Sequence, residues 1–328
     1  VGRHEVRAAL AEGFGDRHRQ IVGPLGDADD DVVAGFDAGA PVDEDVGMLV
    51  YAWVHTAPSV GRSVKHPVRG RSGTDIGERN RLARGDKPRC MEVRVYRGRA
   101  DEPAADRAVT GDLLTMTAET ATPAVRVWQP HRQVAFGRRD SHAAGYDAAT
   151  AAAAERGYDP YERRVGGRAV AYTGRTLAVA AAVPIADVRR GTCERYDEVS
   201  RTLVAVLSDL GADVTRGEPA DAYCAGSHSV SSVDGGAPTG KIAGIAQRVQ
   251  SGAALVAANL TVAEADVAAI RSVLAPVYRA LDVPFDPSTV GSVATAGGPD
   301  DPAAVRQAVE AALVGDREQR VVSIDSER

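Results

Sequence analysis

A cysteine in a polar loop is the residue of this sequence best suited to covalent chemistry. Cys224 lies in the stretch DAYCAGSHSV, where glycine and serine indicate a loop and His228 follows four residues later. A thiol in such a loop can act as a nucleophile when a nearby base or cation favours the thiolate. His228 is a candidate for that base, but its position in the sequence fixes no geometry. A lone cysteine can equally be an inert thiol, so both interpretations stay open.

An isolated lysine is the second chemical signal. Lysine occurs only at Lys65, Lys87 and Lys241, and the other basic side chains are arginines. An ammonium is a compact point charge with three movable donors, whereas the guanidinium of arginine is a wide planar fork. Lys241 opens the stretch KIAGIAQR, in which Gly244 leaves room for a group to approach the backbone. It can therefore serve an oxyanion, or be a solvated lysine at the start of a strand.

A doubled glycine between basic residues is the third signal. The stretch RRVGGRAV, residues 163–170, contains Arg164, Gly166, Gly167 and Arg168. Adjacent glycines let the backbone turn sharply and expose amide N–H groups, and the arginines beside them could meet an anion or a carbonyl. A Gly-Gly pair is also a common hairpin turn. Taken alone, the stretch favours the hairpin.

Composition excludes several classes of protein. The 328 residues are 44% hydrophobic and 26% charged, with a net charge of -6 and only 5% aromatic residues. This balance predicts a soluble protein with a core of Ala, Val and Leu, in one large domain or two smaller ones. Basic stripes interleaved with aromatics, membrane-length apolar runs and a secretory signal are absent from the sequence, which argues against nucleic acid and membrane and favours the cytoplasm.

The cysteines do not suggest a metal site. Cys90, Cys193 and Cys224 are odd in number and show no C-x-x-C spacing. Neither a disulfide framework nor a zinc site is expected, so any chemistry they perform would be that of single thiols.

Regular patterning begins at Met91. Residues 1–90 combine charge blocks with Gly and Pro breaks, and the chain opens on Val1. We expect 1–90 to be a poorly ordered extension or an overlong reading of the gene, 91–316 to be the folded domain, and 317–328 to be a polar tail.

The elements that must position these residues can be read from hydrophobic periodicity. Strands are expected at 92–96, twice within 123–140, on both sides of the glycine turn in 161–184, at 241–249 and at 253–262. Helices are expected at 105–119, 147–157, 194–210, 264–281 and 302–314. Strands outnumber clean strand–helix alternations, which predicts an α+β fold with a mixed sheet flanked by helices.

The order of the motifs resembles a known superfamily. RRxGGxxV is followed about sixty residues later by a Cys-x-Gly loop and then by GKIAGIAQR. This arrangement is similar to that of the lipoate-protein ligases and octanoyltransferases, over about two-thirds of the chain. The resemblance implies the biotin/lipoate protein ligase catalytic fold, which is like that of class II aminoacyl-tRNA synthetases.

Within that superfamily the sequence looks most like the cysteine-dependent transferases, which place an acyl-accepting cysteine in a CPGxY loop. The resemblance implies that Cys224 forms a thioester with the acyl chain and that Lys241 hydrogen-bonds the acyl carbonyl. It also implies an acyl and carrier pocket, an apolar wall and a set of supporting residues. The pocket would comprise Arg164, Gly166, Gly167, Arg168, Gly226 and Gly244, the wall Val170 and 177–183, and the support Tyr172, His228 and Gln247.

The sequence departs from the family pattern at two pairs. Tyr172-Thr173 stands where the family often has His-Asp, and Ser251-Gly252 replaces a downstream His-Gly. The extra small domain of the ATP-using ligases is not expected in 282–328, a segment too short and too broken by Gly and Pro. This favours a transferase, although the second part of a ligase could be a separate chain.

Three functions therefore remain open. A transferase would move an octanoyl or lipoyl group to a lysine of a lipoyl domain, on the glycine-cleavage H protein or a 2-oxoacid dehydrogenase acyltransferase subunit, with no cofactor. An ATP-dependent ligase would use ATP and Mg, with lipoate or octanoate as the acyl group. A non-catalytic paralogue would bind lipoyl or acyl-carrier proteins without reaction. The longer GRGRxGR-type loop typical of biotin ligases is not found in the sequence.

Overall fold

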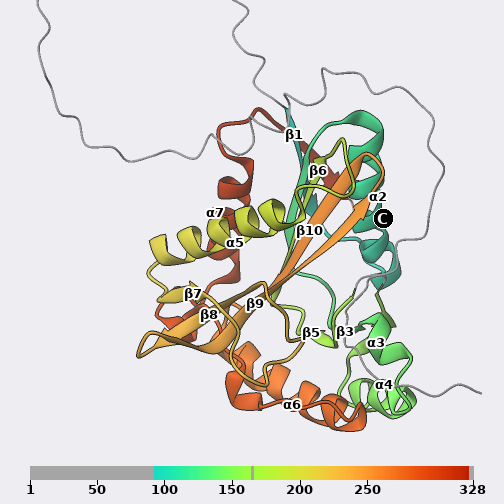
Figure 1. Cartoon of the computed structure of the whole chain (residues 1–328), viewed down its shortest axis with the longest axis vertical. Helices are drawn as coiled ribbons and strands as arrows, with labels where there is room; N and C mark the ends of the chain where they lie inside the picture. Colours follow the sequence, from blue (N-terminus) through green and yellow to red (C-terminus); the bar gives the residue numbers. More distant parts are fainter. Residues whose placement is uncertain (1–91, 164–165, 325–328) are drawn as a thin grey trace, which may run out of the picture. The chain divides into compact units, whose positions relative to one another are not determined.

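An eight-stranded mixed sheet forms the centre of the protein. A computed structural model describes residues 92–163 and 166–324, so the expected extension at 1–90 and Arg164 lie outside the described residues. The sheet is parallel among its first three strands and antiparallel from there on (Figure 1). In spatial order its strands are β11 (Gln319–Ile324), β1 (Val93–Gly98), β2 (Ala124–Trp128), β6 (Leu177–Pro184), β10 (Ala253–Leu260), β9 (Ala237–Gln250), β8 (Ser229–Asp234) and β7 (Val214–Arg216).

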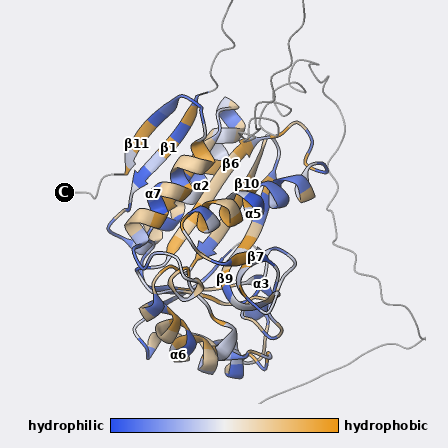
Figure 2. Ribbon diagram, turned by 90° about the vertical axis from the view of Figure 1, so that its left-hand side faces the viewer, coloured by the Kyte–Doolittle hydropathy of each residue, from blue (hydrophilic) through white to orange (hydrophobic). Residues whose placement is uncertain are grey.

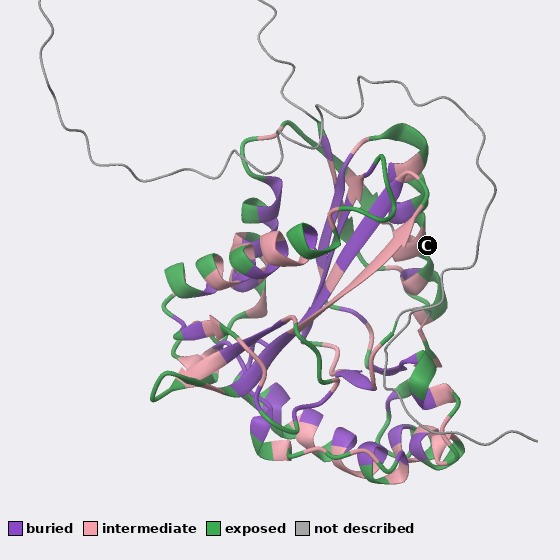
Figure 3. Ribbon diagram, viewed as in Figure 1, coloured by how far each residue is buried: buried purple, intermediate pink, exposed green. Residues whose placement is uncertain are grey.

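The central strands are buried on both faces because small and branched residues alternate along them. In β6, Leu177 and Val179 belong to one core cluster, while Ala180 and Ala182 belong to another on the opposite face. β10 alternates in the same way and pairs with β6 over its full length. Alanine lets a helix approach the sheet closely, so the scarcity of aromatic residues gives the tight packing that the composition predicts. Figure 3 shows these strands as the most buried part of the fold.

Helices cover both faces of the sheet. Helix α2 packs on the alanine-rich face against β6 and β10, and α5 and α7 pack on the other face (Figures 1 and 2). Asp301 caps α7 by accepting the Ala303 N–H, and Pro302 occupies the first helical turn. None of the helices in the described ranges is long and apolar enough to cross a membrane. These helices span Pro103–Thr120 (α2), Thr192–Asp209 (α5) and Pro302–Val314 (α7).

A second, three-stranded sheet lies with its own helices at one end of the large sheet (Figure 1). Its core contains Val134, Phe136, Ile270 and Val277, contributed by strands and by the longest of these helices. Two short 3-10 helices, η2 (Pro287–Thr289) and η3 (Ala294–Ala296), follow that helix. The elements are β3 (Gln133–Phe136), β4 (Asp159–Glu162), β5 (Val170–Tyr172), α3 (Arg138–Ser141), α4 (Tyr146–Ala154) and α6 (Glu264–Ala280).

The hairpin expected at the doubled glycine is wrong. Strand β4 pairs with β3 in parallel and β5 pairs with β3 in antiparallel orientation, so β3 lies between the two strands that flank the glycines. Strands β4 and β5 are therefore not paired with each other as the two arms of a hairpin would be. Sequence spacing could not distinguish these cases, because the partner strand β3 comes earlier in the chain.

The closing segment also differs from the expected polar tail. Residues 319–324 form β11, which pairs in parallel with β1 at the edge of the large sheet. Its side chains are mostly exposed, and Val321 is 46% exposed. An edge strand of this kind buries little apolar surface, so it lacks the hydrophobic signal by which strands are predicted.

Candidate active site

The loop between β7 and β8 presents the thiol of Cys224. The Cys224 sulfur accepts hydrogen bonds from the backbone N–H of Arg168, at 3.3 Å, and from Nη2 of Arg163, at 3.4 Å. The backbone of Cys224 has φ +45°, in the left-handed region that few non-glycine residues occupy. A guanidinium and an amide dipole directed at the sulfur both favour a negative charge there. The structure thus brings together the cysteine loop and the doubled-glycine segment.

Gly167 is required by this contact. Its φ is +93°, and a Cβ atom at this position would lie 2.8 Å from the Cys224 sulfur and 2.8 Å from Nη2 of Arg163. Any side chain would therefore displace the thiol or the guanidinium. Gly166, by contrast, faces open space.

Arg163 is held in a polar pocket next to the thiol. Its Nη2 also donates to the carbonyl of Arg168 at 2.7 Å. Burial is the largest influence and lowers the pKa of Arg163, but electrostatic interactions with Cys224 and Tyr172 and the hydrogen bond to Cys224 raise it, and the pKa of Arg163 is raised overall. Burial raises the pKa of Tyr172, and Cys224 adds to this while Arg163 opposes it. Tyr172 therefore belongs to the electrostatic surroundings of the thiol, as a neutral phenol.

The Lys241 side chain binds the backbone of the cysteine loop. Its side chain is 1% exposed, and Nζ donates to the carbonyl oxygens of Tyr223 at 2.9 Å and Cys224 at 2.8 Å. The third direction is taken by Glu218, whose two carboxylate oxygens lie at 2.9 and 3.2 Å. An ammonium has three N–H groups, so all of them have protein acceptors. Its contact with Cys224 runs through the carbonyl and not through the sulfur.

Gly244 makes space for this lysine. A Cβ atom at Gly244 would lie 3.2 Å from Cε and 3.5 Å from Nζ of Lys241. The pairing of β8 with β9 slips between Val230 and Ser231, because Val230 pairs with Ala243 and Ser231 with Lys241. Such a bulge interrupts the strict alternation of side chains along β9. It lets the Lys241 side chain lie against Gly244, three positions along the same strand. The groups that approach Gly244 are therefore the lysine itself and the side chain of Asn259.

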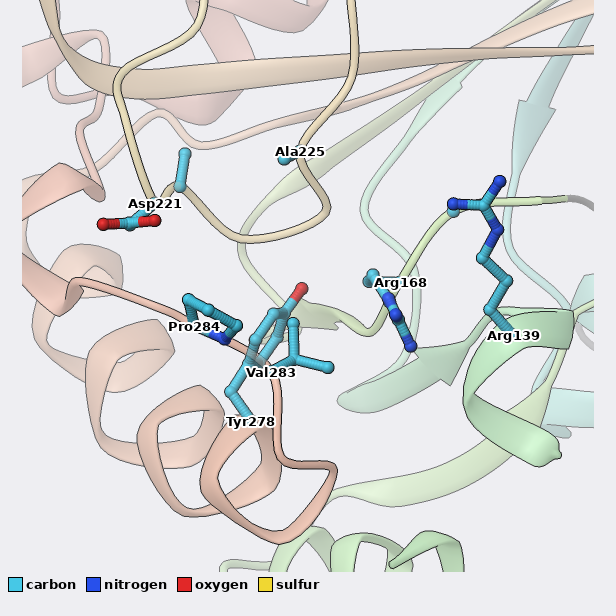
Figure 4. A pocket seen from close by; sticks show the side chains of 9 residues that line it. Arg139, Arg168, Asp221, Ala225, Tyr278, Val283 and Pro284 are labelled. Atoms are coloured by element: carbon cyan, nitrogen blue, oxygen red, sulfur yellow. The ribbon is translucent and has the colours of Figure 1, made fainter. Parts of the chain in front are cut away.

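A cavity of about 310 Å³ opens beside the cysteine loop. It is bounded by Gly167 and Arg168, by the loop residues Asp221 and Ala225, and by Tyr278 at the end of α6 (Figure 4). Arg168 is paired with Asp140 at 3.1 Å. This volume falls at the lower end of the range for small-molecule pockets, about 300–1,000 Å³. The remaining lining residues are Arg139, Ala222, Val283 and Pro284.

Two predicted supporting residues lie elsewhere. The ring of His228 stacks on Tyr196 of α5, with centroids 3.9 Å apart, and no hydrogen bond joins it to Cys224. Gln247 accepts from Nε of Arg195 and donates to the carbonyl of Thr192 at 3.2 Å. His228, directly before β8, and Gln247, in β9, thus both contact α5. His228 is not placed as a base for the thiol.

The predicted apolar wall is part of the packed core. Val170 is buried in the cluster beneath α6, and 177–183 form the central strand β6. None of these residues lines the cavity described above. Gly226 is exposed, with open space around it.

Sequence reasoning missed three residues of the site. Arg163 was visible as half of the Arg-Arg pair, but only its neighbour Arg164 was chosen. Glu218 and Tyr278 carry no local signal, because a glutamate before a proline and a tyrosine in an amphipathic helix are ordinary. Glu218 contacts Lys241 from the β7–β8 loop that also carries Cys224, and Tyr278 reaches the site from α6.

Asp106 is a structural carboxylate. It accepts from Nη2 of the fully buried Arg126 at 2.5 Å and from Nε1 of Trp128 at 3.1 Å. Among residues 92–163 and 166–324, no group of three His, Cys, Asp or Glu side chains is arranged to hold a metal ion.

A family model for the lipoyl protein ligase A/B catalytic domain matches residues 102–313, which include the site, the three-stranded sheet and every strand of the large sheet except β1 and β11. The chain belongs to this family. The match includes the cysteine loop, the doubled glycine and the lysine strand, but it does not distinguish cysteine-dependent transferases from ligases. A search of curated proteins found no match for this lipoyl protein ligase domain.

Solved structures share the fold of this lipoyl protein ligase domain. A lipoate-protein ligase A bound with ATP is 19% identical, with a TM-score of 0.56, over 72% of this chain and 90% of that chain. Protein Ta0514 from T. acidophilum is 18% identical, with a TM-score of 0.54 and the same coverage. A bipartite lipoate protein ligase of Thermoplasma acidophilum, studied with its E2 lipoyl domain, is 18% identical with a TM-score of 0.52, over 71% of this chain and 88% of that chain. At these identities the similarity establishes the fold alone.

Proposed function

We propose that the protein transfers an octanoyl or lipoyl group to a lysine of a lipoyl domain through a thioester on Cys224. The observation that carries this proposal is the pair of donors on the Cys224 sulfur, from Arg163 and from the Arg168 amide. Inert buried thiols have no need of a guanidinium. The family supports lipoylation as the general activity.

The first half-reaction forms the thioester. The Cys224 thiolate attacks the carbonyl carbon of the acyl donor, and the C–S bond forms as the bond to the carrier breaks. For an octanoyl-lysine donor the leaving amine takes up the proton that the thiol loses. The Arg163 guanidinium and the Arg168 amide lie next to the sulfur, where they can stabilise charge on the neighbouring acyl oxygen.

The second half-reaction releases the acyl group to the acceptor. The neutral lysine amine of a lipoyl domain attacks the thioester carbonyl, the C–N bond forms, and the Cys224 thiolate leaves and is reprotonated. We place the entering lysine in the cavity beside the loop. The exposed Asp221 carboxylate at the cavity can attract an ammonium, and Arg139 can meet acidic groups that flank it.

Lys241 orients the nucleophile in this proposal. With Glu218 and two carbonyl oxygens as acceptors, it fixes the peptide on the carboxyl side of Cys224. To donate to an acyl carbonyl as well, it would exchange one of these acceptors, and the glutamate is the only side chain among the three. The proposed partners are the glycine-cleavage H protein and 2-oxoacid dehydrogenase acyltransferase subunits.

Incubation with octanoylated H protein tests the proposal. Intact-mass analysis should show an octanoyl adduct on the wild-type protein without ATP, and addition of an apo lipoyl domain should discharge it. Cys224→Ser should form no labile adduct and should lose transfer, by about a thousandfold or more, because the nucleophile is gone. Cys193→Ser removes an exposed free thiol and is the matched control.

An ATP-dependent ligase is the second candidate. The structural neighbour bound with ATP and the arginines around the cavity favour it, since Arg139 and Arg168 could meet a phosphate. In that case Cys224→Ser would retain transfer, and lipoate or octanoate would be attached only when ATP and Mg are supplied. A protein that forms neither an adduct nor a product would be a binding paralogue.

A further inference from the structure

Tyr278 joins the two loops that hold the thiol. Its hydroxyl accepts a hydrogen bond from the backbone N–H of Cys224 at 2.6 Å and donates to the carbonyl of Ala169 at 2.9 Å. The side chain is 1% exposed and comes from the last turns of α6. One hydroxyl group therefore connects the cysteine loop, the doubled-glycine segment and a core helix.

We propose that Tyr278 is a positioning residue for the Cys224 nucleophile, an inference that rests on the function proposed above. Ala169 directly follows Arg168, whose amide donates to the Cys224 sulfur. The hydroxyl thus fixes both the donor amide and the residue that carries the acceptor sulfur. Lys241 holds the carbonyl side of Cys224, so the peptide groups on both sides of this residue are held.

The backbone of Cys224 explains why two anchors are needed. A non-glycine residue with φ +45° is strained, and such conformations persist only where the surroundings impose them. Without the Tyr278 hydroxyl, the N–H of Cys224 and the carbonyl of Ala169 lose their shared partner. The loop can then relax, and the sulfur moves away from the Arg168 amide.

Burial keeps this phenol neutral. Burial raises the pKa of Tyr278 well above its ordinary value, and Cys224 raises it further. The hydroxyl therefore stays both a donor and an acceptor. Phenylalanine at this position keeps the ring that packs on Phe285, with centroids 4.9 Å apart, and removes only the hydroxyl.

The test compares Tyr278→Phe with Val273→Ala. Val273 is fully buried in the same helix and core cluster and contacts neither loop through a polar group. Iodoacetamide labelling of Cys224, read on the peptide that contains it, should slow about tenfold in Tyr278→Phe. The kcat for octanoyl transfer should fall about ten- to a hundredfold, with KM within about twofold. Val273→Ala should keep both rates within about twofold while lowering the melting temperature.

Two results would overturn the inference. One is wild-type labelling and transfer by Tyr278→Phe, and the other is the same loss of labelling in Val273→Ala. Hydrogen exchange of the Cys224 amide in the wild-type protein gives a measurement that needs no variant, because this amide should exchange slowly although residues 225–227, which follow it, are exposed. Rapid exchange would contradict the hydrogen bond. Absence of any octanoyl adduct in the wild type would instead refute the proposed function, which labelling does not test.

Discussion

Two buried cations in this protein have opposite surroundings. Arg126 is completely buried, and its carboxylate partner Asp106 is also closed to solvent, with an exposed side-chain fraction of 3%. Lys241 is equally buried, but its partner Glu218 is 20% exposed. Burial lowers the pKa of Arg126, with Asp106 opposing that effect. The first cation and its partner lie against the large sheet and are both closed to solvent. The second cation lies behind the loop that carries Cys224.

The acceptors of the two cations explain the difference. Arg126 donates to Asp106 and to the carbonyl of Gly98, joining β2 to the start of α2 and the end of β1. Lys241 directs two of its three N–H groups to consecutive carbonyl oxygens of the loop that carries the thiol. The hydrogen bonds of Arg126 join three elements of the fold, whereas those of Lys241 fix the backbone of the loop that carries Cys224. Variants of each cation can separate these roles.

The largest effect is expected from Arg126→Met. Removing the cation leaves Asp106 buried without a counter-charge, which typically costs about 3–5 kcal/mol of unfolding free energy. Urea denaturation measures the loss, and transfer activity per folded molecule should stay within about twofold of the wild type. The double variant Arg126→Met/Asp106→Asn should recover at least half of the stability. An activity loss as large as that of a Lys241 variant would erase the distinction drawn here.

Lys241→Met should act mainly on activity. We expect about a hundredfold slower formation of the octanoyl adduct on Cys224, because the loop loses the donor that fixes two carbonyl groups. The loss of unfolding free energy should be smaller than for Arg126→Met, since water can reach Glu218. Lys241→Arg tests the space: the wide guanidinium does not fit between Gly244 and the loop, so it should not restore the rate. Adduct formation followed by intact mass decides both.

Glu218→Gln should give the smallest change. Glutamine keeps an acceptor for Lys241 but removes the negative charge, and two loop carbonyls still hold the ammonium. A partly exposed ion pair contributes ~1 kcal/mol, so kcat/KM should fall about three- to tenfold. Steady-state transfer to an apo lipoyl domain measures this. If the glutamine variant were as slow as Lys241→Met, the carboxylate would have a chemical role beyond holding the lysine.

Elements with strong periodicity were predictable from the sequence. The expected helices at 264–281 and 302–314 correspond to Glu264–Ala280 and Pro302–Val314, and the alternation after Met91 indicated β1. Each of these segments buries a continuous apolar face, so its hydrophobic periodicity can be recognised within the segment itself. The family resemblance, confirmed by the match over residues 102–313, came from the order of three short motifs.

The partners of the site residues were not predictable in the same way. Lys241 was singled out by its rarity, but nothing near it indicated that Glu218 and the Cys224 carbonyl would take its donors. The bulge in β9 and the placement of β3 between β4 and β5 depend on strands paired from distant parts of the chain. His228, which follows the thiol by four residues in sequence, instead stacks on Tyr196. Distance along the chain is a poor guide where loops meet.

The pairing of β1 with β11 has a consequence for how this domain is made. The first and last strands of the described chain lie side by side in parallel register, from Val93 with Gln319 to Gly98 with Ile324. During synthesis, β1 leaves the ribosome long before β11 exists. The outer edge of β1 therefore stays unpaired until β11 emerges. Contacts between such distant segments slow folding. A nascent chain stalled before β11 would leave the outer edge of β1 free to pair with other chains, so this edge of β1 is covered only once β11 has been synthesised.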